Sequence, residues 1–470
     1  MIEQYADSLY RSLAASFGRL DHNDRVQTAI RYSLEEEGHG EGFMERRIKG
    51  HTPERSPATL SPNQCADATL TLLRKLSGRD FLRGVAGRNL LWERAALLNL
   101  PGARNQRNAT NHCRLLQTRT GWLAVNLARE DDHGLLPAWL ETPAAAQLGT
   151  PIDWSRLQSL VISQDQLTLH RRAQLLGLPI AALDSHTRTN WFAWQPLGAP
   201  LRETNAPRVV DLSALWAGPL CAHLLGALGA QVIKVESVHR PDGARTGSPE
   251  HYARLNQGKR HALLDFHNHK GLAKLAQLIE WADIVITASR PRALAQLGIE
   301  PNNVTHKPAS LTTNGTLWLN ITGYGGDPAH GHRVAFGDDA AIAGGLYHRA
   351  RTPSSQEPYQ QSSAQQGSAQ QEASQTAGQL EWRPEFYADA VADPLTGLHA
   401  ALATHYAWRA GKSGQLGVAL ADIAHLVSQW SDLNRRLQPE PGTAHAVREA
   451  VAAPGEHNSE IFSQLAAACY

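Results

Sequence analysis

Cysteine is scarce and scattered in this chain. The four cysteines, Cys65, Cys113, Cys221 and Cys469, lie far apart and form no Cys-x-x-Cys pair. This argues against a zinc site and against a disulfide framework, because both need cysteines at close or repeated intervals. The pattern favours a protein of the reducing cytoplasm, and we expect no metal site.

The chain also lacks an excess of either charge. Its 45 Lys and Arg residues balance 44 Asp and Glu residues, which leaves a formal net charge of +1. No net field would therefore draw the protein to nucleic acid or to an anionic membrane. We expect neither as a partner.

Long apolar runs are missing as well. Residues 1–7 lack the basic and apolar regions of a signal peptide, and no run is long enough to span a bilayer. The nearest candidate, residues 214–230, is interrupted by Pro219 and His223. We expect a soluble cytoplasmic protein, and its 470 residues are enough for two or three domains.

The first half of the chain predicts mostly helical structure. Residues 1–60 predict a helical and flexible segment without recognisable chemistry. Apolar residues at helical spacing over residues 62–99 predict a helical pair, and two short apolar runs around Thr120 and Gly121 predict a β-hairpin within residues 113–128. We expect a small α+β domain over residues 61–200.

A different pattern follows a linker at residues 201–207. Strands are predicted at 208–213, 229–236, 282–287 and 316–322, with helices at 220–228 and 271–281. Alternating strands and helices build doubly wound parallel sheets. We therefore expect a Rossmann-like α/β domain over residues 208–435, followed by a C-terminal tail at 436–470.

A Ser/Gln-rich segment interrupts this predicted domain. Residues 354–379 contain six Ser and nine Gln, which leaves too little apolar surface to offset the entropy of ordering the chain. We expect a disordered insertion. Order is predicted to resume at Trp382, with an apolar stripe at Leu395, Leu398, Leu402 and Tyr406 on a helix that ends near Gly411.

Several polar groups suggest chemistry that their surroundings do not support. Glu236 ends a predicted strand, but the turn at residues 214–219 lacks the G-x-G-x-x-G pattern of dinucleotide-binding folds. Asp338 and Asp339 suit a metal or acid–base pair, yet helix capping is the favoured interpretation. The close-set histidines at 267 and 269, and at 330 and 332, are expected to be solvated.

Asp393 allows two interpretations. It precedes Pro394 at a predicted helix start, so the simpler one is a helix N-cap. The positive end of a helix dipole also keeps a carboxylate ionised, and an ionised carboxylate in a dry pocket can act as a nucleophile. The residues alone leave both open.

The motifs from Arg208 onward resemble the family III CoA-transferases, which include formyl-CoA transferase and carnitine CoA-transferase. No single motif is decisive, and the resemblance rests on many motifs in the same order. They occupy residues 211–219, 228–236, 240–243, 255–260, 264–265, 290–298, 322–325, 392–397 and 411–415.

The resemblance gives Asp393 the position of the catalytic nucleophile. The implied reaction moves CoA between an acyl-CoA and a carboxylic acid through a mixed anhydride and an aspartyl-CoA thioester. No permanently bound cofactor is implied, since CoA and acyl-CoA are substrates. Family members form homodimers, and we expect a homodimer here.

The resemblance also implies where CoA lies. Lys234 and Arg260 are further candidates for contacts with the CoA phosphates. The matching positions for CoA binding are Trp216, Ala217, Arg240, Leu264, Asp265, Ala288, Ser289, Arg290, Gln296 and Arg333.

Three features depart from the family pattern. Residues 105–111 lack the expected glycine-rich loop, and the Ser/Gln insertion falls just upstream of Asp393. Residues 113–139 and 174–180 resemble a small domain that follows the catalytic half in family members, so the order of parts is permuted here.

Two alternatives follow from the resemblance. One is a catalytically silent CoA-binding relative, suggested by the missing loop and the rearranged parts. The other is an isomerase like the 2-methylacyl-CoA racemases, whose Gly-His-Asp stretch corresponds to Ala335-Phe336-Gly337. Phe336 cannot move a proton, so CoA transfer is preferred.

Overall fold

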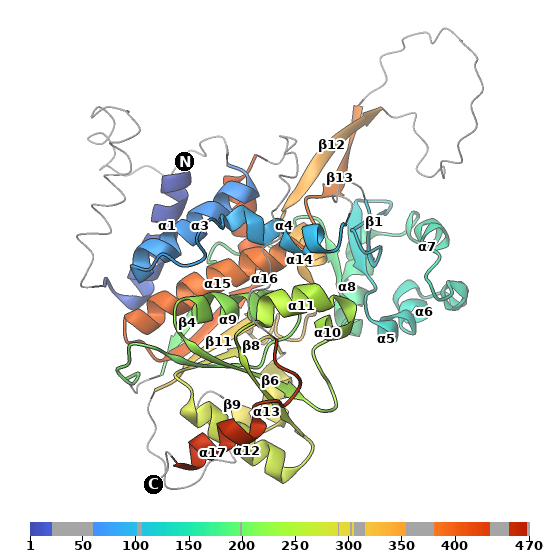
Figure 1. The fold of residues 1–470 in the computed structure, drawn as a ribbon. Helices are drawn as coiled ribbons and strands as arrows, with labels where there is room; N and C mark the ends of the chain where they lie inside the picture. Colours follow the sequence, from blue (N-terminus) through green and yellow to red (C-terminus); the bar gives the residue numbers. More distant parts are fainter. Residues whose placement is uncertain are drawn as a thin grey trace, which may run out of the picture.

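The computed structural model describes residues 1–20, 60–100, 106–197, 200–289, 291–300, 303–304, 315–353, 380–432 and 451–467. These residues form a large α/β unit, a smaller α+β unit beside it, and a projecting two-stranded ribbon (Figure 1). The predicted Ser/Gln insertion, residues 354–379, lies outside the described ranges.

A seven-stranded sheet forms the centre of the large unit. The strand order is β4-β14-β11-β8-β5-β6-β7, with β4 antiparallel to its neighbour and the other pairs parallel. All four strands predicted between residues 208 and 322 are present, which confirms a mixed α/β fold with a largely parallel sheet. The strands are β4 (Ala193–Pro196), β5 (Arg208–Asp211), β6 (Gln231–Ser237), β7 (Arg260–Leu264), β8 (Ile284–Thr287), β11 (Leu317–Thr322) and β14 (Gly414–Ala419).

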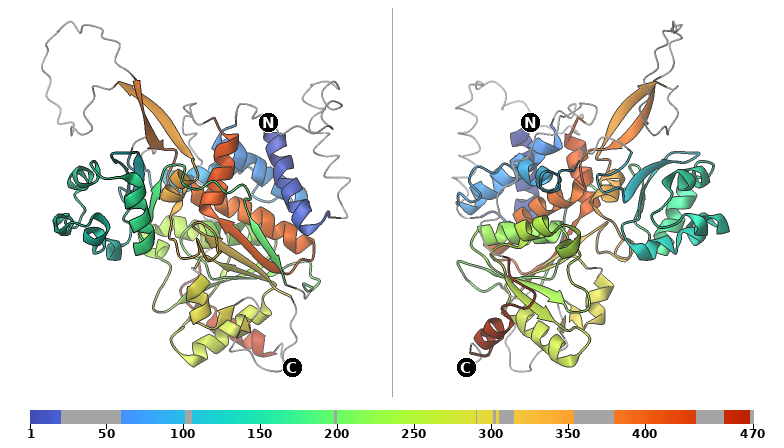
Figure 2. Two further views of the ribbon diagram at one scale, coloured as in Figure 1. Left: turned by 180° about the vertical axis from the view of Figure 1, so that it is seen from behind. Right: turned by 45° about the vertical axis from the view of Figure 1, so that its right-hand side comes forward.

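Helices cover both faces of this sheet (Figure 2). Neighbouring strand residues point to opposite faces, so Val209 joins one hydrophobic cluster and Val210 joins another. The Val209 face packs against α9 (Ala217–Ala227), α15 (Ala392–Arg409) and α16 (Leu420–Trp430). The Val210 face packs against α12 (His269–Trp281) and α17 (Asn458–Ala467).

Helix α9 starts earlier than the sequence suggested. The prediction placed its start at Leu220, whereas the helix begins at Ala217. The first turn of a helix tolerates proline, because its N–H groups have no intrahelical partner, so Pro219 does not delay the start.

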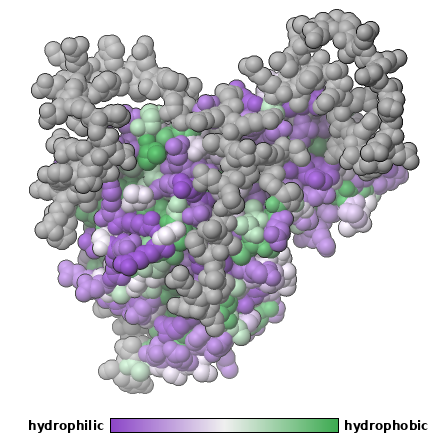
Figure 3. Space-filling view, turned by 45° about the horizontal axis from the view of Figure 1, so that its top comes forward, coloured by the Kyte–Doolittle hydropathy of each residue, from purple (hydrophilic) through white to green (hydrophobic). Residues whose placement is uncertain are grey.

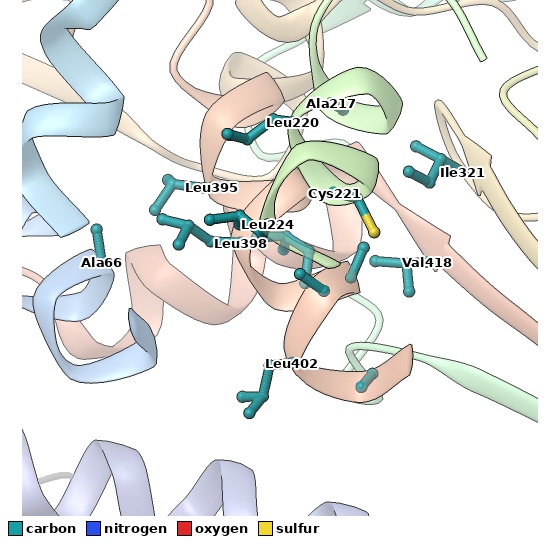
Figure 4. Packing of buried hydrophobic residues seen from close by; sticks show 14 of the residues in the cluster. Ala66, Ala217, Leu220, Cys221, Leu224, Ile321, Leu395, Leu398, Leu402 and Val418 are labelled. Carbon is teal, nitrogen blue, oxygen red and sulfur yellow. The ribbon is translucent and has the colours of Figure 1, made fainter. Parts of the chain in front are cut away.

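The N-terminal helices pack on α15 rather than on the small unit. The predicted helical pair is confirmed as α3 (Pro62–Ser77) and α4 (Gly87–Leu97), and α1 (Ile2–Phe17) lies beside it. Figure 4 shows Ala66 of α3 facing Leu395 and Leu398 of α15, with Leu220 and Leu224 of α9 on the other side.

The small unit has its own hydrophobic core around Trp139, which is completely buried. Its β1 (Cys113–Gln117) and β2 (Trp122–Asn126) form the predicted hairpin, and β3 (Ile180–Ala182) adds a third antiparallel strand. The domain boundaries stay a prediction. Helices α3 and α4, which the prediction placed in the small domain, share the core of the large unit. The helices of the small unit are α5 (Glu130–His133), α6 (Leu136–Leu140), η1 (Pro143–Gln147), α7 (Trp154–Val161) and α8 (Gln166–Leu176).

A β-ribbon connects α14 (Gly337–Ala343) to α15. It consists of β12 (Tyr347–Pro353) and β13 (Leu380–Phe386), which pair antiparallel. The remaining elements are α10 (Ala244–Gly247), α11 (Pro249–Asn256), α13 (Pro291–Gln296), β9 (Ile299–Glu300) and β10 (Asn303–Val304).

The surface is mixed in character. On the face shown in Figure 3, hydrophilic side chains surround small apolar areas. Within the described part of the chain, no helix combines the length and the hydropathy needed to cross a membrane.

The Leu398→Ala variant tests the packing of α15. Leu398 is completely buried, so its truncation should destabilise the protein by about 2–5 kcal/mol through lost burial and a cavity. Urea unfolding measures this, with Leu175→Ala as the control because Leu175 is 87 % exposed. Equal losses in the two variants would contradict the packing described here.

Candidate active site

Asp393 lies inside the first turn of α15. The helix begins at Ala392 and its N-cap is Val391, so the N-cap interpretation of Asp393 is wrong, and Pro394 is the third helical residue rather than the first. The reason is local, since the Asp393 N–H already donates to the Ala390 carbonyl at 2.9 Å. The Asp393 side chain is therefore available for other contacts and remains partly exposed.

The start of α14 lies directly against this carboxylate. The Gly337 N–H donates a hydrogen bond to Asp393. A Cβ at position 337 would lie 2.3 Å from Asp393 Oδ2 and 2.4 Å from the Ala390 carbonyl oxygen. Only glycine permits this approach, because any side chain would displace Asp393 or its backbone.

Two further aspartates and one arginine complete the Asp393 cluster, defined as Asp338, Asp389, Asp393 and Arg94. Asp338 Oδ1 accepts a hydrogen bond from the Ala390 N–H at 2.9 Å. Arg94 Nη1 lies 3.0 Å from Asp389 Oδ2, and the Asp389 side chain is only 3 % exposed. The cluster thus joins α14, the turn before α15, and α4.

Burial makes the acids of this cluster hard to ionise. Desolvation raises the pKa of Asp393 to about 7, while the positive charge of Arg94 opposes the rise and Asp338 adds to it. Desolvation likewise raises the pKa of Asp389 to about 7. Near neutral pH these two groups can therefore gain or lose protons, which is typical of catalytic sites.

The neighbouring acids Asp338 and Asp339 have different roles. Asp339 Oδ1 accepts hydrogen bonds from the Phe336 N–H at 3.0 Å and from Asn126 Nδ2 at 3.1 Å. The first bond satisfies a backbone donor at the helix start, as predicted for a capping residue. Asp338 instead bonds to Ala390 and, at 2.7 Å, to Asn108 Nδ2. The capping interpretation is wrong for Asp338.

Trp216 and Ala217 lie near the Asp393 cluster. The guanidinium carbon of Arg94 is 5.5 Å from the Trp216 ring centroid, and the Trp216 ring meets His251 edge-on at 4.7 Å. Helix α9 also contacts α15, since a Cβ on Gly397 would lie 2.8 Å from the Ala217 carbonyl oxygen.

The other predicted CoA positions follow further strands of the sheet. Arg240 follows β6, Asp265 follows β7, and Ala288 and Ser289 follow β8. Because these strands are parallel, the residues lie at the same carboxyl edge. Arg240, Ala288, Ser289 and Gln296 are exposed, while Leu264 belongs to the core.

Of the two remaining predicted arginines, the structure describes one. Arg333 follows β11, and its guanidinium carbon lies 3.4 Å from the Tyr324 ring centroid. Arg290 lies outside the described residues.

The side chains first considered for the CoA phosphates are not suitably placed. Lys234 is 1 % exposed and donates to Asp242 at 3.0 Å, so it has no access to a ligand. Arg260 begins β7 at the opposite edge of the sheet and donates to Gln464 at 2.7 Å.

His267 pairs with His239 instead of His269. The two rings stack at 4.1 Å, beside Asp265, which is hydrogen-bonded to His239 at 3.0 Å. The ligand atoms of these three residues lie within 4.8 Å of one another, so within the described part of the chain this group could hold a cation. Asp265 also accepts bonds from the His267 N–H and Asn268 Nδ2, which a cation would have to displace.

Comparison with known proteins gives the family of the chain. Residues 206–454 match CoA-transferase family III, and the chain belongs to this family. A probable fatty acyl-CoA transferase, Rv3272 of Mycobacterium tuberculosis, is 27% identical over 169 residues, which are 34% of this chain and 42% of that protein. A succinate–glutarate CoA-transferase of Agrobacterium fabrum is 25% identical over 259 residues, 51% of this chain and 57% of that protein.

Solved structures also match part of the chain. The crystal structure of Rv3272 has a TM-score of 0.35 at 24% identity and covers 48% of this chain and 57% of that one. A CAIB/BAIF family protein from Brucella suis also has a TM-score of 0.35 at 24% identity, covering 48% and 55%. The chain spans about half the length of the curated relatives named here.

The Asp393→Asn variant tests the electrostatics of the cluster. The folded-state pKa of Asp393 is about 7, above its unfolded value, so wild-type stability falls as the pH rises through neutrality. An amide avoids this loss. We therefore compare the free energy of unfolding of Asp393→Asn with that of wild type at two pH values. The difference in favour of the variant should be larger at pH 8 than at pH 5, by on the order of 2 kcal/mol.

Urea unfolding at both pH values measures this difference. Asp80→Asn is the control, because the Asp80 side chain is 63% exposed. An Asp393→Asn effect that is the same at pH 5 and pH 8 would show that the carboxyl is not held as described.

Proposed function

We propose that this protein moves CoA from an acyl-CoA to a carboxylic acid, with Asp393 as the nucleophile. One observation carries the proposal: the carboxylate of the half-buried Asp393 stands in the first turn of a buried helix and accepts a hydrogen bond from the Gly337 N–H. This residue lies within the segment that matches the family.

The sheet supports a CoA site at its carboxyl edge. Numbered along the chain, its six parallel strands have the order 3-2-1-4-5-6, which is the order of Rossmann-like folds. Such folds bind ligands where the strand order reverses, here between β5 and β8. Trp216 and Ala217 follow β5, and Ala288 and Ser289 follow β8.

We therefore place CoA along this edge, from the end of β7 past β5 toward Asp393. The exposed side chain of Arg240 is a candidate partner for a phosphate. The full proposed set is Trp216, Ala217, Arg240, Leu264, Asp265, Ala288, Ser289, Arg290, Gln296 and Arg333.

The reaction follows from carboxylate and thiolate exchange. The Asp393 carboxylate attacks the thioester carbonyl, and CoA leaves as the thiolate while a mixed anhydride forms. The thiolate then attacks the Asp393 carbonyl, which releases the donor acid and leaves an aspartyl-CoA thioester. The acceptor carboxylate reverses these two steps, so the new acyl-CoA forms and Asp393 returns to its carboxylate.

Ionisation of Asp393 controls the first step. Only the carboxylate is nucleophilic, and the pKa of Asp393 is about 7 in the free protein. The rate of Asp393 acylation should therefore rise with pH through neutrality and level off above about pH 8. The Gly337 hydrogen bond favours the ionised form.

Covalent trapping tests the proposal. The protein is incubated with fatty acyl-CoA and dicarboxylic acyl-CoA donors, treated with hydroxylamine or borohydride, and analysed by peptide mass mapping. We expect modification confined to the peptide that carries Asp393, lost in Asp393→Asn and retained in Asp80→Asn. The first donors to test follow the names of the relatives, which include a fatty acyl-CoA transferase and a succinate–glutarate transferase.

The same experiment distinguishes CoA transfer from the alternative of a catalytically silent CoA-binding relative. If CoA raises the thermal stability of the protein but no peptide is modified by any donor, the chain is a CoA-binding relative without transferase activity.

The isomerase alternative is less well supported by the site. Gly337 stands beside Asp393 and has no side chain, and Phe336, which precedes it at the N-cap of α14, cannot carry a proton. Solvent deuterium entering the α-carbon of an acyl-CoA without an acceptor acid would favour isomerisation. The homodimer and the cytoplasmic location stay predictions.

A further inference from the structure

We propose that Arg94 is a positioning residue of this site, which holds Asp389 and supplies the positive charge that the anionic form of Asp393 needs. This inference rests on the proposed function. Arg94 belongs to α4, outside the segment of residues 206–454 that matches the family. The N-terminal helices would then complete the reactive site as well as cover α15.

Arg94 contacts the segment on which Asp393 depends. Its Nη1 lies 3.0 Å from Asp389 Oδ2, and the two side chains are 19% and 3% exposed. The next residue, Ala390, donates its N–H to Asp338 and accepts the Asp393 N–H, each at 2.9 Å. Movement of Asp389 would therefore disturb both hydrogen bonds that place the start of α15.

Helix α4 is anchored by the two residues before Arg94. Trp92 Nε1 donates to Asn63 Oδ1 of α3 at 3.0 Å. Arg254 Nε of α11 donates to Glu93 Oε1 at 2.6 Å, and both side chains are almost fully buried. The Arg94 side chain thus extends from a fixed helix face, which allows it to hold Asp389 in one position.

The charges around Asp393 support the same role. Arg94 lowers the pKa of Asp338, Asp389 and Asp393, against the rise that burial causes in each. Asp338 and Asp389 both raise the pKa of Asp393.

Other described titratable groups near this position are neutral or have partners of their own. Burial lowers the pKa of His251 to about 3, so it stays neutral beside Arg94. Glu93 pairs with Arg254 and Asp339 caps α14. Arg94 is thus the cation that pairs with Asp389 in the described structure, and its charge lowers the pKa of all three aspartates.

The pH dependence of Asp393 acylation tests this inference. Wild type, Arg94→Met, Arg94→Lys and Arg88→Met are compared between pH 5.5 and pH 9 with a donor that acylates wild type. Arg88 lies on the same helix but pairs with Asp67 at 2.9 Å, so Arg88→Met controls for charge loss and for effects on α4.

We expect Arg94→Met to move the midpoint to higher pH by about one unit, since a lost cation disfavours the carboxylate. Acylation at pH 7 should then fall about five-fold and recover largely at pH 9. Arg94→Lys should retain most of the wild-type profile, and Arg88→Met should match wild type.

Asp389→Asn provides a change of opposite sign. It removes a negative charge that raises the pKa of Asp393, so its midpoint should move to lower pH. If Arg94→Met fails to fold by circular dichroism, Arg94→Lys and Asp389→Asn decide the question on their own midpoints.

Four results would overturn the inference. An unchanged midpoint in Arg94→Met, or an equal loss at every pH, would show a purely structural role. A midpoint in Arg94→Lys that shifts as far as complete loss of the positive charge predicts would do the same. So would an unchanged midpoint in Asp389→Asn. Failure of wild type to become acylated is a different outcome, since it overturns the proposed function and this inference with it.

Discussion

The rest of the molecule depends on the all-round burial of α15. Fifteen of its eighteen residues are buried, so other elements surround this helix on all sides. The sequence predicted an apolar stripe on one face, whereas the structure buries residues all around the helix. Small residues such as Ala400 and Ala403 allow neighbours close on every side, and the buried His399 bonds to Tyr5 at 2.6 Å. A helix enclosed in this way cannot shift alone, which fixes Asp393 at its start.

Such a site has a thermodynamic cost. Three aspartates and one arginine in a desolvated region would be replaced by apolar residues if stability were the only requirement. Retained acids that ionise near neutral pH are typical of reactive sites, where stability is lower than the fold permits. The Gly337 backbone and Arg94 limit the cost, because one hydrogen-bonds the ionised acid and the other supplies opposite charge.

The sequence predicted the fold better than the site. Apolar runs identified β5, β6, β8 and β11, whereas β14 contains Gly414 and Gly417 and therefore lacks a strand-like run. Asp393 could be found through its motif. Arg94 could not, because its partner Asp389 is distant in the chain and only the packing of α4 brings them together. Asp338 resembled a cap because its bond to the Ala390 N–H exists only in the folded chain.

The ribbon of β12 and β13 separates the spacing between the starts of α14 and α15 from the length of the chain that connects them. Its base joins α14 to α15, whose starts must meet at Gly337 and Asp393, and the paired strands hold that spacing from Tyr347↔Phe386 to Pro353↔Leu380. Beyond the last pair, the entropy of closing the chain grows only slowly with its length. The paired strands therefore preserve the spacing between Gly337 and Asp393 independently of the length of the connection beyond them.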